Sequence, residues 1–193
     1  MPPKARITRD MILDAAFDLV RAEGHEALNV RTLARRLGCS TQPILYNYPT
    51  MDALKDAVYE KADRFHTAHI LPRGGEGPDA LLELGLNYVR FGHEEKHLFR
   101  FLFESDRFGG MDMNALLKGP GVGELVAILA EALGCPAAEA EKVFLTFFAV
   151  AHGLGSLLCN NAREYDETEC AAMLETVFNG ALAALTSKGE EYA

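Results

Sequence analysis

Hydrophobic positions along the chain recur at helical spacing, and the alternation typical of β-strands is nearly absent. In the first segment they stand at i, i+3, i+4, i+7 and i+8, which places them on one helix face. These positions are Ile12, Ala15, Ala16, Leu19 and Val20. Thr8 before the segment is a suitable N-cap and Gly24 after it a suitable terminator, so we predict a helix over about residues 9–23.

Two short helices follow, joined by a tight turn. Asn29 is placed to cap the first of them, and Gly38, which can adopt a positive φ, ends it. Ser40 is placed to cap the second, and Pro43 falls within its first turn, where the missing N–H group costs nothing. This is a helix-turn-helix pattern, whose second helix typically enters the major groove of DNA.

The rest of the chain carries further helical patterns and one clear linker at residues 72–78. The helices predicted after the linker cover about residues 79–93, 96–104, 121–134, 137–161 and 167–187. We therefore predict an all-α protein with a three-helix unit at residues 1–50 and a helical bundle at residues 72–193. A long helix over about residues 51–71, capped by Thr50, connects the two parts.

Composition agrees with a folded protein, because 49% of the 193 residues are hydrophobic. The uninterrupted apolar runs are shorter than the roughly 18–20 residues of a membrane span, and no secretory signal is recognised. We expect a cytoplasmic protein with no membrane partner. Thiols are expected at the cysteines, which show neither zinc-site nor disulfide-framework spacing. They are Cys39, Cys135, Cys159 and Cys170.

The net charge of −9 is distributed unevenly along the chain. Residues 1–66 hold ten Lys and Arg against nine Asp and Glu, whereas residues 67–193 hold nine against nineteen. Any phosphate-binding surface is therefore expected in the first third.

The second helix of the helix-turn-helix carries side chains suited to DNA. Gln42 can pair with adenine, and Pro43 can press on a thymine methyl group. Tyrosine and asparagine side chains suit phosphate oxygens, and nearby arginines supply salt-dependent attraction. The predicted DNA-binding residues are Asn29, Arg31, Ser40, Thr41, Gln42, Pro43, Tyr46, Asn47, Tyr48 and Thr50, with basic support from Lys4, Arg6, Arg9, Arg35 and Arg36. The alternative is an ordinary three-helix surface with solvated arginines.

Three runs in this unit share anchor positions with a known family: Thr8 to Ala16, Asn29 to Ser40, and Tyr48 to Leu54. Over residues 8–60 the chain resembles the TetR (tetracycline-repressor-like) transcriptional regulators. The resemblance implies an all-helical homodimer that binds a palindromic operator, usually as a repressor. It also implies release of the operator when a small molecule enters the C-terminal bundle.

The chain departs from the family pattern late in the recognition helix. The usual tyrosine position holds Leu45, and Tyr46 stands one place later. Tyr48 replaces a phenylalanine, and Met51 replaces the lysine usually found just after the next N-cap. The phosphate-contacting tyrosine therefore stays open between Tyr46 and Tyr48.

Aromatic residues crowd into three helices of the C-terminal part, where they could line an apolar pocket. The predicted ligand-binding residues are Tyr88, Phe91, Phe99, Phe103, Met113, Phe144, Phe147, Phe148 and His152. His152 is the polar group best suited to orient an apolar or amphipathic effector, although a core histidine satisfied by a backbone carbonyl is an equal interpretation. For most of the aromatic residues the alternative is simple core filling.

The last two helices combine small residues with more apolar area than one inward face requires. A two-fold four-helix interface between two copies would bury that area. The predicted dimer-interface residues are Gly153, Ser156, Leu157, Val177, Gly180, Ala181 and Ala184. The alternative is burial of both faces within one chain.

Enzymatic function is not expected, because the sequence shows no nucleophilic triad order, phosphate-binding loop or dinucleotide motif. Histidines at helical spacing in Asp63-x-x-His66-x-x-His69 and His93-Glu94-x-x-His97 could arise by chance, and we predict no metal and no cofactor. Two alternative functions stay open. One is a helical-bundle metal-binding protein or enzyme with His and Glu ligands, and the other is an adaptor that binds a ligand or partner without DNA.

Overall fold

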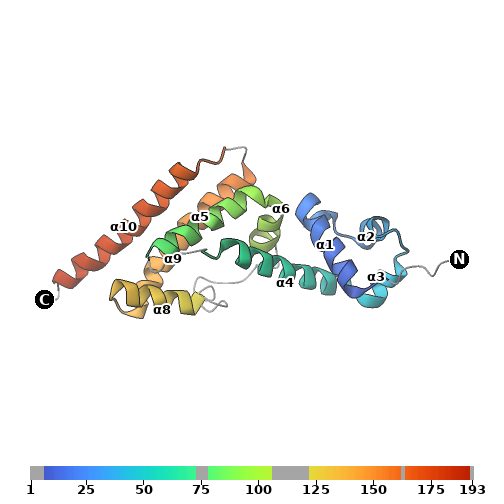
Figure 1. Ribbon diagram of the computed structural model, residues 1–193, viewed down its shortest axis with the longest axis horizontal. Helices are drawn as coiled ribbons and strands as arrows, with labels where there is room; N and C mark the ends of the chain where they lie inside the picture. The colour runs from blue at the N-terminus through green and yellow to red at the C-terminus, as the bar shows by residue number, and fades with distance from the viewer. Residues whose placement is uncertain (1–6, 73–77, 106–121, 162–163, 192–193) are drawn as a thin grey trace. The chain divides into compact units, whose positions relative to one another are not determined.

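The computed structural model describes residues 7–72, 78–105, 122–161 and 164–191. Its regular elements are helices (Figure 1), which confirms the all-α prediction. The chain divides into two compact units. Unit 1 comprises Met1–Ala68 with Glu95–Phe108, and unit 2 comprises His69–Glu94 with Gly109–Ala193. The described residues 95–105 thus cluster with the N-terminal part, although they follow the predicted linker.

Unit 1 begins with helix α1 (Arg9–Glu23), which matches the predicted span. The Thr8 hydroxyl accepts a hydrogen bond from the Met11 amide at 3.2 Å, so Thr8 is the cap. Gly24 follows the helix with a φ of +89°, a backbone conformation that side chains rarely adopt. The short 3₁₀ helix η1 (His25–Ala27) then leads towards the helix-turn-helix.

The helix-turn-helix consists of α2 (Val30–Arg36) and α3 (Gln42–Asn47). The Asn29 carboxamide oxygen accepts from the amides of Arg31 and Thr32 at 3.1 and 3.0 Å, which confirms Asn29 as the cap. Gly38, with a φ of +62°, makes the turn between the helices.

The predicted cap at Ser40 is wrong, because α3 begins one residue later than a Ser40 cap requires. Thr41 occupies the N-cap position and makes no side-chain capping bond. Pro43 lies at the second position of α3 and removes one of the two N–H groups that a cap normally binds.

Helix α4 (Met51–Ile70) begins at the predicted cap, since the Thr50 hydroxyl accepts from the Ala53 amide at 3.1 Å. Its inner face consists of Leu54, Val58, Ala62 and His66, all buried. The long helix thereby supplies one wall of the core of unit 1.

A later stretch of chain, α6 (Lys96–Phe99) followed by the π-helix η2 (Arg100–Glu104), completes unit 1. Arg21 of α1 donates from Nε to a carboxylate oxygen of Glu95 at 2.8 Å, and this hydrogen bond raises the pKa of the guanidinium. The Tyr59 hydroxyl donates to the Leu102 carbonyl at 3.1 Å. The rings of His66 and Phe103 meet edge to face at 5.0 Å. These contacts fix residues 95–104 on α1 and α4.

Unit 2 is built from α5 (Pro78–Glu94), α8 (Val122–Leu133), α9 (Ala137–Asn160) and α10 (Glu167–Glu191). Helix α9 packs against α5, α8 and α10 (Figure 1). By length and composition α9 is also long and apolar enough to cross a membrane. The short uninterrupted apolar runs of the sequence did not predict this. The core helices of other proteins pass the same test; α9 packs against three helices of unit 2, and 39% of its most apolar stretch is buried.

Two glycines of α5 allow close approach of α9. A Cβ atom added at Gly92 would lie 2.9 Å from both the Cα and the carbonyl oxygen of Gly155. A Cβ atom added at Gly85 would lie 2.5 Å from the ring of Phe147. Gly155 of α9 is therefore buried against α5 of its own chain.

We predict that Gly92→Ala lowers the free energy of unfolding by about 1–3 kcal/mol, because the backbone at Gly155 cannot move aside as a side chain would. Urea denaturation measures the change. Gly123→Ala is the matched control, because an added Cβ on Gly123 of α8 meets nothing within 4 Å. Equal stability of the Gly92→Ala protein and the wild type would contradict this packing.

Candidate nucleic-acid interface

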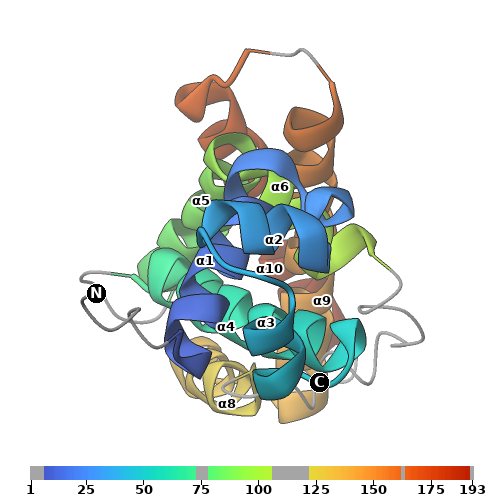
Figure 2. The ribbon, with the colours of Figure 1, turned by 90° about the vertical axis from the view of Figure 1, so that its right-hand side faces the viewer.

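The outer face of α3 is formed by Gln42, Leu45 and Tyr46, all exposed. They are spaced i, i+3 and i+4, so they share one side of the helix. The opposite side is anchored by Ile44 and Tyr48, which are 1% and 2% exposed. Figure 2 looks onto α2 and α3, the two helices of the motif.

Tyr46, rather than Tyr48, is the tyrosine available to phosphate. Tyr46 is 82% exposed, whereas the ring of Tyr48 is buried and covered by the Arg9 guanidinium at 4.7 Å from its centroid. A DNA contact for Tyr48 therefore stays a prediction that its burial does not favour. Tyr48 follows Ile44 by four residues and lies on the same inward face, a spacing that sequence reasoning should have used.

The structure adds Leu45 to the candidate interface. Its side chain is 44% exposed on α3, beside Gln42 and Tyr46. The resemblance treated this position as a departure from the family pattern, and Leu45 was not among the predicted contacts. Asn47, which was among them, is half-buried, and its amide group donates to the Pro43 carbonyl at 2.8 Å. Leu45 is thus more available to a partner than Asn47.

The remaining predicted contacts lie around α3. Ser40 and Thr50 are exposed, and Thr41 and Pro43 are half-buried. The Asn29 side chain serves mainly as the cap of α2 and also donates to the Ala27 carbonyl at 3.2 Å.

Exposed arginines lie on α1 and α2 of the same unit. Arg31 and Arg35 are exposed and make no ion pair with the residues that the structure describes. Arg36 lies 3.9 Å from Glu23, and Arg9 is held over Tyr48. Lys4 and Arg6 lie outside the described residues. Unit 1 therefore combines a neutral helix face with basic side chains beside it, an arrangement suited to a polyanion.

In unit 2 the structure brings together part of the predicted effector site. The Tyr88 hydroxyl lies 2.9 Å from His152 Nδ1, and the His152 ring stacks on Phe148 at 5.7 Å. Phe144 stacks on the other side of this group, 6.3 Å from Phe148. Tyr88 and Phe144 are buried, whereas Phe148 and His152 are half-buried. The hydrogen-bond partner of His152 Nδ1 is thus a side-chain hydroxyl.

The other predicted effector residues have further ring and packing contacts. Phe91 pairs with His69, and Phe147 packs on Phe178 and Gly85 within the core of unit 2. Phe99 and Phe103 belong to unit 1, where their rings lie 5.1 Å apart. Met113 lies outside the described residues. The aromatic set read from the sequence is therefore divided between two cores.

The predicted dimer residues occupy an accessible part of α9 and α10. Gly180 and Ala184 are exposed, and Gly153, Ser156, Val177 and Ala181 are half-buried. Leu157 is 50% exposed, and Cβ atoms added at Gly153 or Gly180 would meet nothing within 4 Å.

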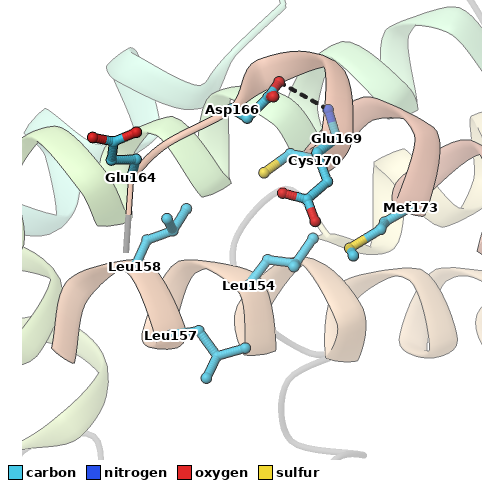
Figure 3. Close-up of a pocket in the computed structure, with 8 residues that line it drawn as sticks. All are labelled: Leu154, Leu157, Leu158, Glu164, Asp166, Glu169, Cys170 and Met173. Atoms are coloured by element: carbon cyan, nitrogen blue, oxygen red, sulfur yellow. Dashed lines mark hydrogen bonds between the residues drawn. The ribbon is translucent and has the colours of Figure 1, made fainter. Parts of the chain in front are cut away.

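A hollow lies beside this region, between α9 and the start of α10. Leu154, Leu157, Leu158 and Met173 give it apolar sides, with carboxylates at its edge (Figure 3). Its volume of about 10 Å³ is far below the roughly 300–1,000 Å³ of ligand pockets, so it is a surface feature of these helices.

The histidine motifs do not form a ligand cluster among the described residues, where no three His, Cys, Asp or Glu side chains gather in a metal-binding arrangement. His66 packs on Phe103, and His93 stacks on Tyr165 at 5.1 Å. His69 Nε2 lies 3.7 Å from a Glu94 oxygen, which is one carboxylate and one imidazole only.

Comparisons with known proteins agree on one family. No family model matches the chain. Tetracycline repressor protein class D from Escherichia coli is 31% identical over 78 residues, which cover 40% of this chain and 36% of that protein. The class H protein from Photobacterium damsela subsp. piscicida matches to the same extent. The match thus spans about a third of the length of these curated relatives.

The likeness of fold extends over most of the chain. A TetR-family transcriptional regulator from Streptomyces coelicolor superposes with a TM-score of 0.68 at 19% identity, covering 95% of this chain and 83% of that one. A TetR-like transcriptional regulator from Rhodococcus sp. RHA1 gives a TM-score of 0.65 at 15% identity, covering 91% and 96%. These proteins are named as transcriptional regulators or repressors.

Replacement of the two tyrosines is expected to separate their roles. Tyr48→Ala should lower the free energy of unfolding by roughly 3 kcal/mol, because it removes a buried ring. Tyr46→Ala should change it by less than about 0.5 kcal/mol, because that side chain is exposed. Thermal and urea denaturation of the two variants gives the comparison. Similar losses in both would show that the assignment of inner and outer faces of α3 is wrong.

Proposed function

We propose that the chain is a TetR-family transcriptional regulator that binds duplex DNA through unit 1. The observation that carries the proposal is the exposed face of α3, anchored from behind by Ile44 and Tyr48 and flanked by exposed arginines. An exposed helix of this kind, the second of a helix-turn-helix, is suited to the major groove. Arg31 and Arg35 supply the contacts to phosphate.

We propose further that the protein acts as a homodimer on a palindromic operator. The accessible small and apolar residues of α9 and α10 support this, because a second copy would cover Leu157 and the open surface at Gly153 and Gly180. Two reading helices related by a two-fold axis match two half-sites of a palindrome.

The regulation we propose is repression relieved by a small apolar or amphipathic effector in unit 2. The Tyr88–His152 pair, with Phe148 against it, offers a hydrogen-bonding group among aromatic rings. Helix α4 is continuous from unit 1 into the first residues of unit 2, so the chain itself provides a route of coupling. An effector can weaken DNA binding only as far as it binds the DNA-free state of the protein more tightly than the DNA-bound state. A screen for compounds that release the bound duplex would identify the effector.

Selection from random duplex DNA with the purified protein tests the function, and we expect enrichment of a palindrome. Arg31→Ala should then weaken binding to the enriched duplex and to other sequences alike, and should reduce the slope of log affinity against log salt by about 1. Fluorescence anisotropy over a salt series measures both quantities.

Lys142→Ala is the control for this series, because Lys142 is an exposed cation of unit 2 that should not affect DNA binding. Failure of a folded protein to enrich any sequence would contradict the proposed function. An unchanged salt slope in Arg31→Ala would remove α2 from the interface.

The dimer is tested by a charge on its proposed face. Leu157→Glu should shift the protein from dimer to monomer in sedimentation velocity, because a carboxylate would be buried between two copies. Ile128→Glu is the matched control, since Ile128 of α8 is 54% exposed and lies outside the proposed face. A dimer that persists in Leu157→Glu, or dissociates equally in both variants, would refute this interface.

A further inference from the structure

We propose that α3 reads adjacent A·T base pairs, with Gln42 on an adenine and Leu45 on a thymine methyl group. This rests on the proposed function, since it specifies which DNA unit 1 recognises. The first observation is that residues 41–48, Thr-Gln-Pro-Ile-Leu-Tyr-Asn-Tyr, contain no Arg, Lys, His, Asp or Glu. Guanine is read chiefly by Arg or Lys, and cytosine by Asp or Glu, so this helix lacks the usual readers of G·C pairs.

The second observation concerns the groups that α3 does present. The Gln42 side chain is exposed, and no hydrogen bond to it from the described residues is found. A free carboxamide can donate to adenine N7 and accept from its N6 amino group. The Asn47 carboxamide, the other amide of α3, already donates to the Pro43 carbonyl at 2.8 Å and is half-buried. Gln42 is therefore the amide available for a bidentate contact.

The third observation is the apolar surface of Leu45, which is 44% exposed although its neighbour Ile44 is buried. Thymine carries the one methyl group in the major groove, and an apolar side chain distinguishes it from cytosine at that position. Burial of Leu45 against that methyl group would give this exposed leucine a partner of matching chemistry.

The spacing of the two side chains along the helix is of the size of one step between base pairs. Gln42 and Leu45 are three residues apart, which corresponds to about 4.5 Å along the helix axis. Base pairs are stacked about 3.4 Å apart, so successive pairs can meet these two side chains. The arginines that bind phosphate lie on α1 and α2, which leaves the neutral face of α3 to the bases.

The test uses the duplex enriched by selection and replaces each thymine of a half-site by deoxyuridine, which lacks only the methyl group. Wild-type protein should lose about three- to five-fold in affinity at one position. Leu45→Ala should lose a similar factor on the thymine duplex and should show no further loss with uracil at that position. Ile128→Ala, with an exposed apolar side chain in unit 2, should respond to uracil as the wild type does.

A change of specificity at the neighbouring pair tests Gln42. Gln42→Ala should reduce discrimination of A·T from G·C there by roughly ten-fold, and Gln42→Arg should change the preferred base from adenine to guanine. Both variants keep the buried face of α3, so circular dichroism should show an intact fold.

The inference is overturned if uracil has no effect at any position, or if its effect persists unchanged in Leu45→Ala. The inference is also overturned if Gln42→Ala changes the preference for a G·C pair of the selected half-site. That result would leave the proposed DNA-binding function standing. Absence of any enriched duplex overturns the proposed function, and this inference with it.

Discussion

The candidate interface depends on the burial of Ile44 and Tyr48. A helix of six residues, such as α3, does not form stably in water by itself, because nucleation is costly and few hydrogen bonds repay it. Two buried side chains four residues apart hold α3 against the core of unit 1. The same anchoring orients the remaining residues outwards, so the exposed Gln42, Leu45 and Tyr46 have a fixed presentation.

Unit 2 rests on a different constraint, the close approach of α5 and α9. Gly92 meets the backbone of Gly155, and a side chain at Gly92 would have no room there. On the same helix α9, Leu157 is 50% exposed, and a Cβ atom added at Gly153 would meet nothing within 4 Å. The Tyr88–His152 pair joins the same two helices, so a molecule that entered there would act on a tightly packed pair.

Much of the fold could be predicted because its signals are local. Thr8, Asn29 and Thr50 cap helices as their residue types and positions indicate, and Gly38 makes the turn. The first residue of α3 could not be predicted from a cap. Thr41 at the N-cap position makes no side-chain capping bond, and Pro43 has no N–H group to donate one.

The placement of the candidate-site residues has non-local causes. Tyr46 and Tyr48 have the same chemistry, and only packing distinguishes the exposed one from the buried one. Phe99 and Phe103 follow the linker, yet they join unit 1 because residues 95–104 contact α1 and α4. A helical period identifies an apolar face, but it does not say which core that face joins.

The central claim is that the outer face of α3 meets the bases of duplex DNA, and photochemical cross-linking tests it most directly. Duplexes with 5-iodo-deoxyuridine in place of single thymines would be irradiated with the protein, and the attached peptide identified by mass spectrometry. The account predicts attachment within residues 42–46, with Tyr46 as the prominent aromatic acceptor. Attachment confined to α9 and α10 would contradict it, since the DNA would then contact unit 2 instead.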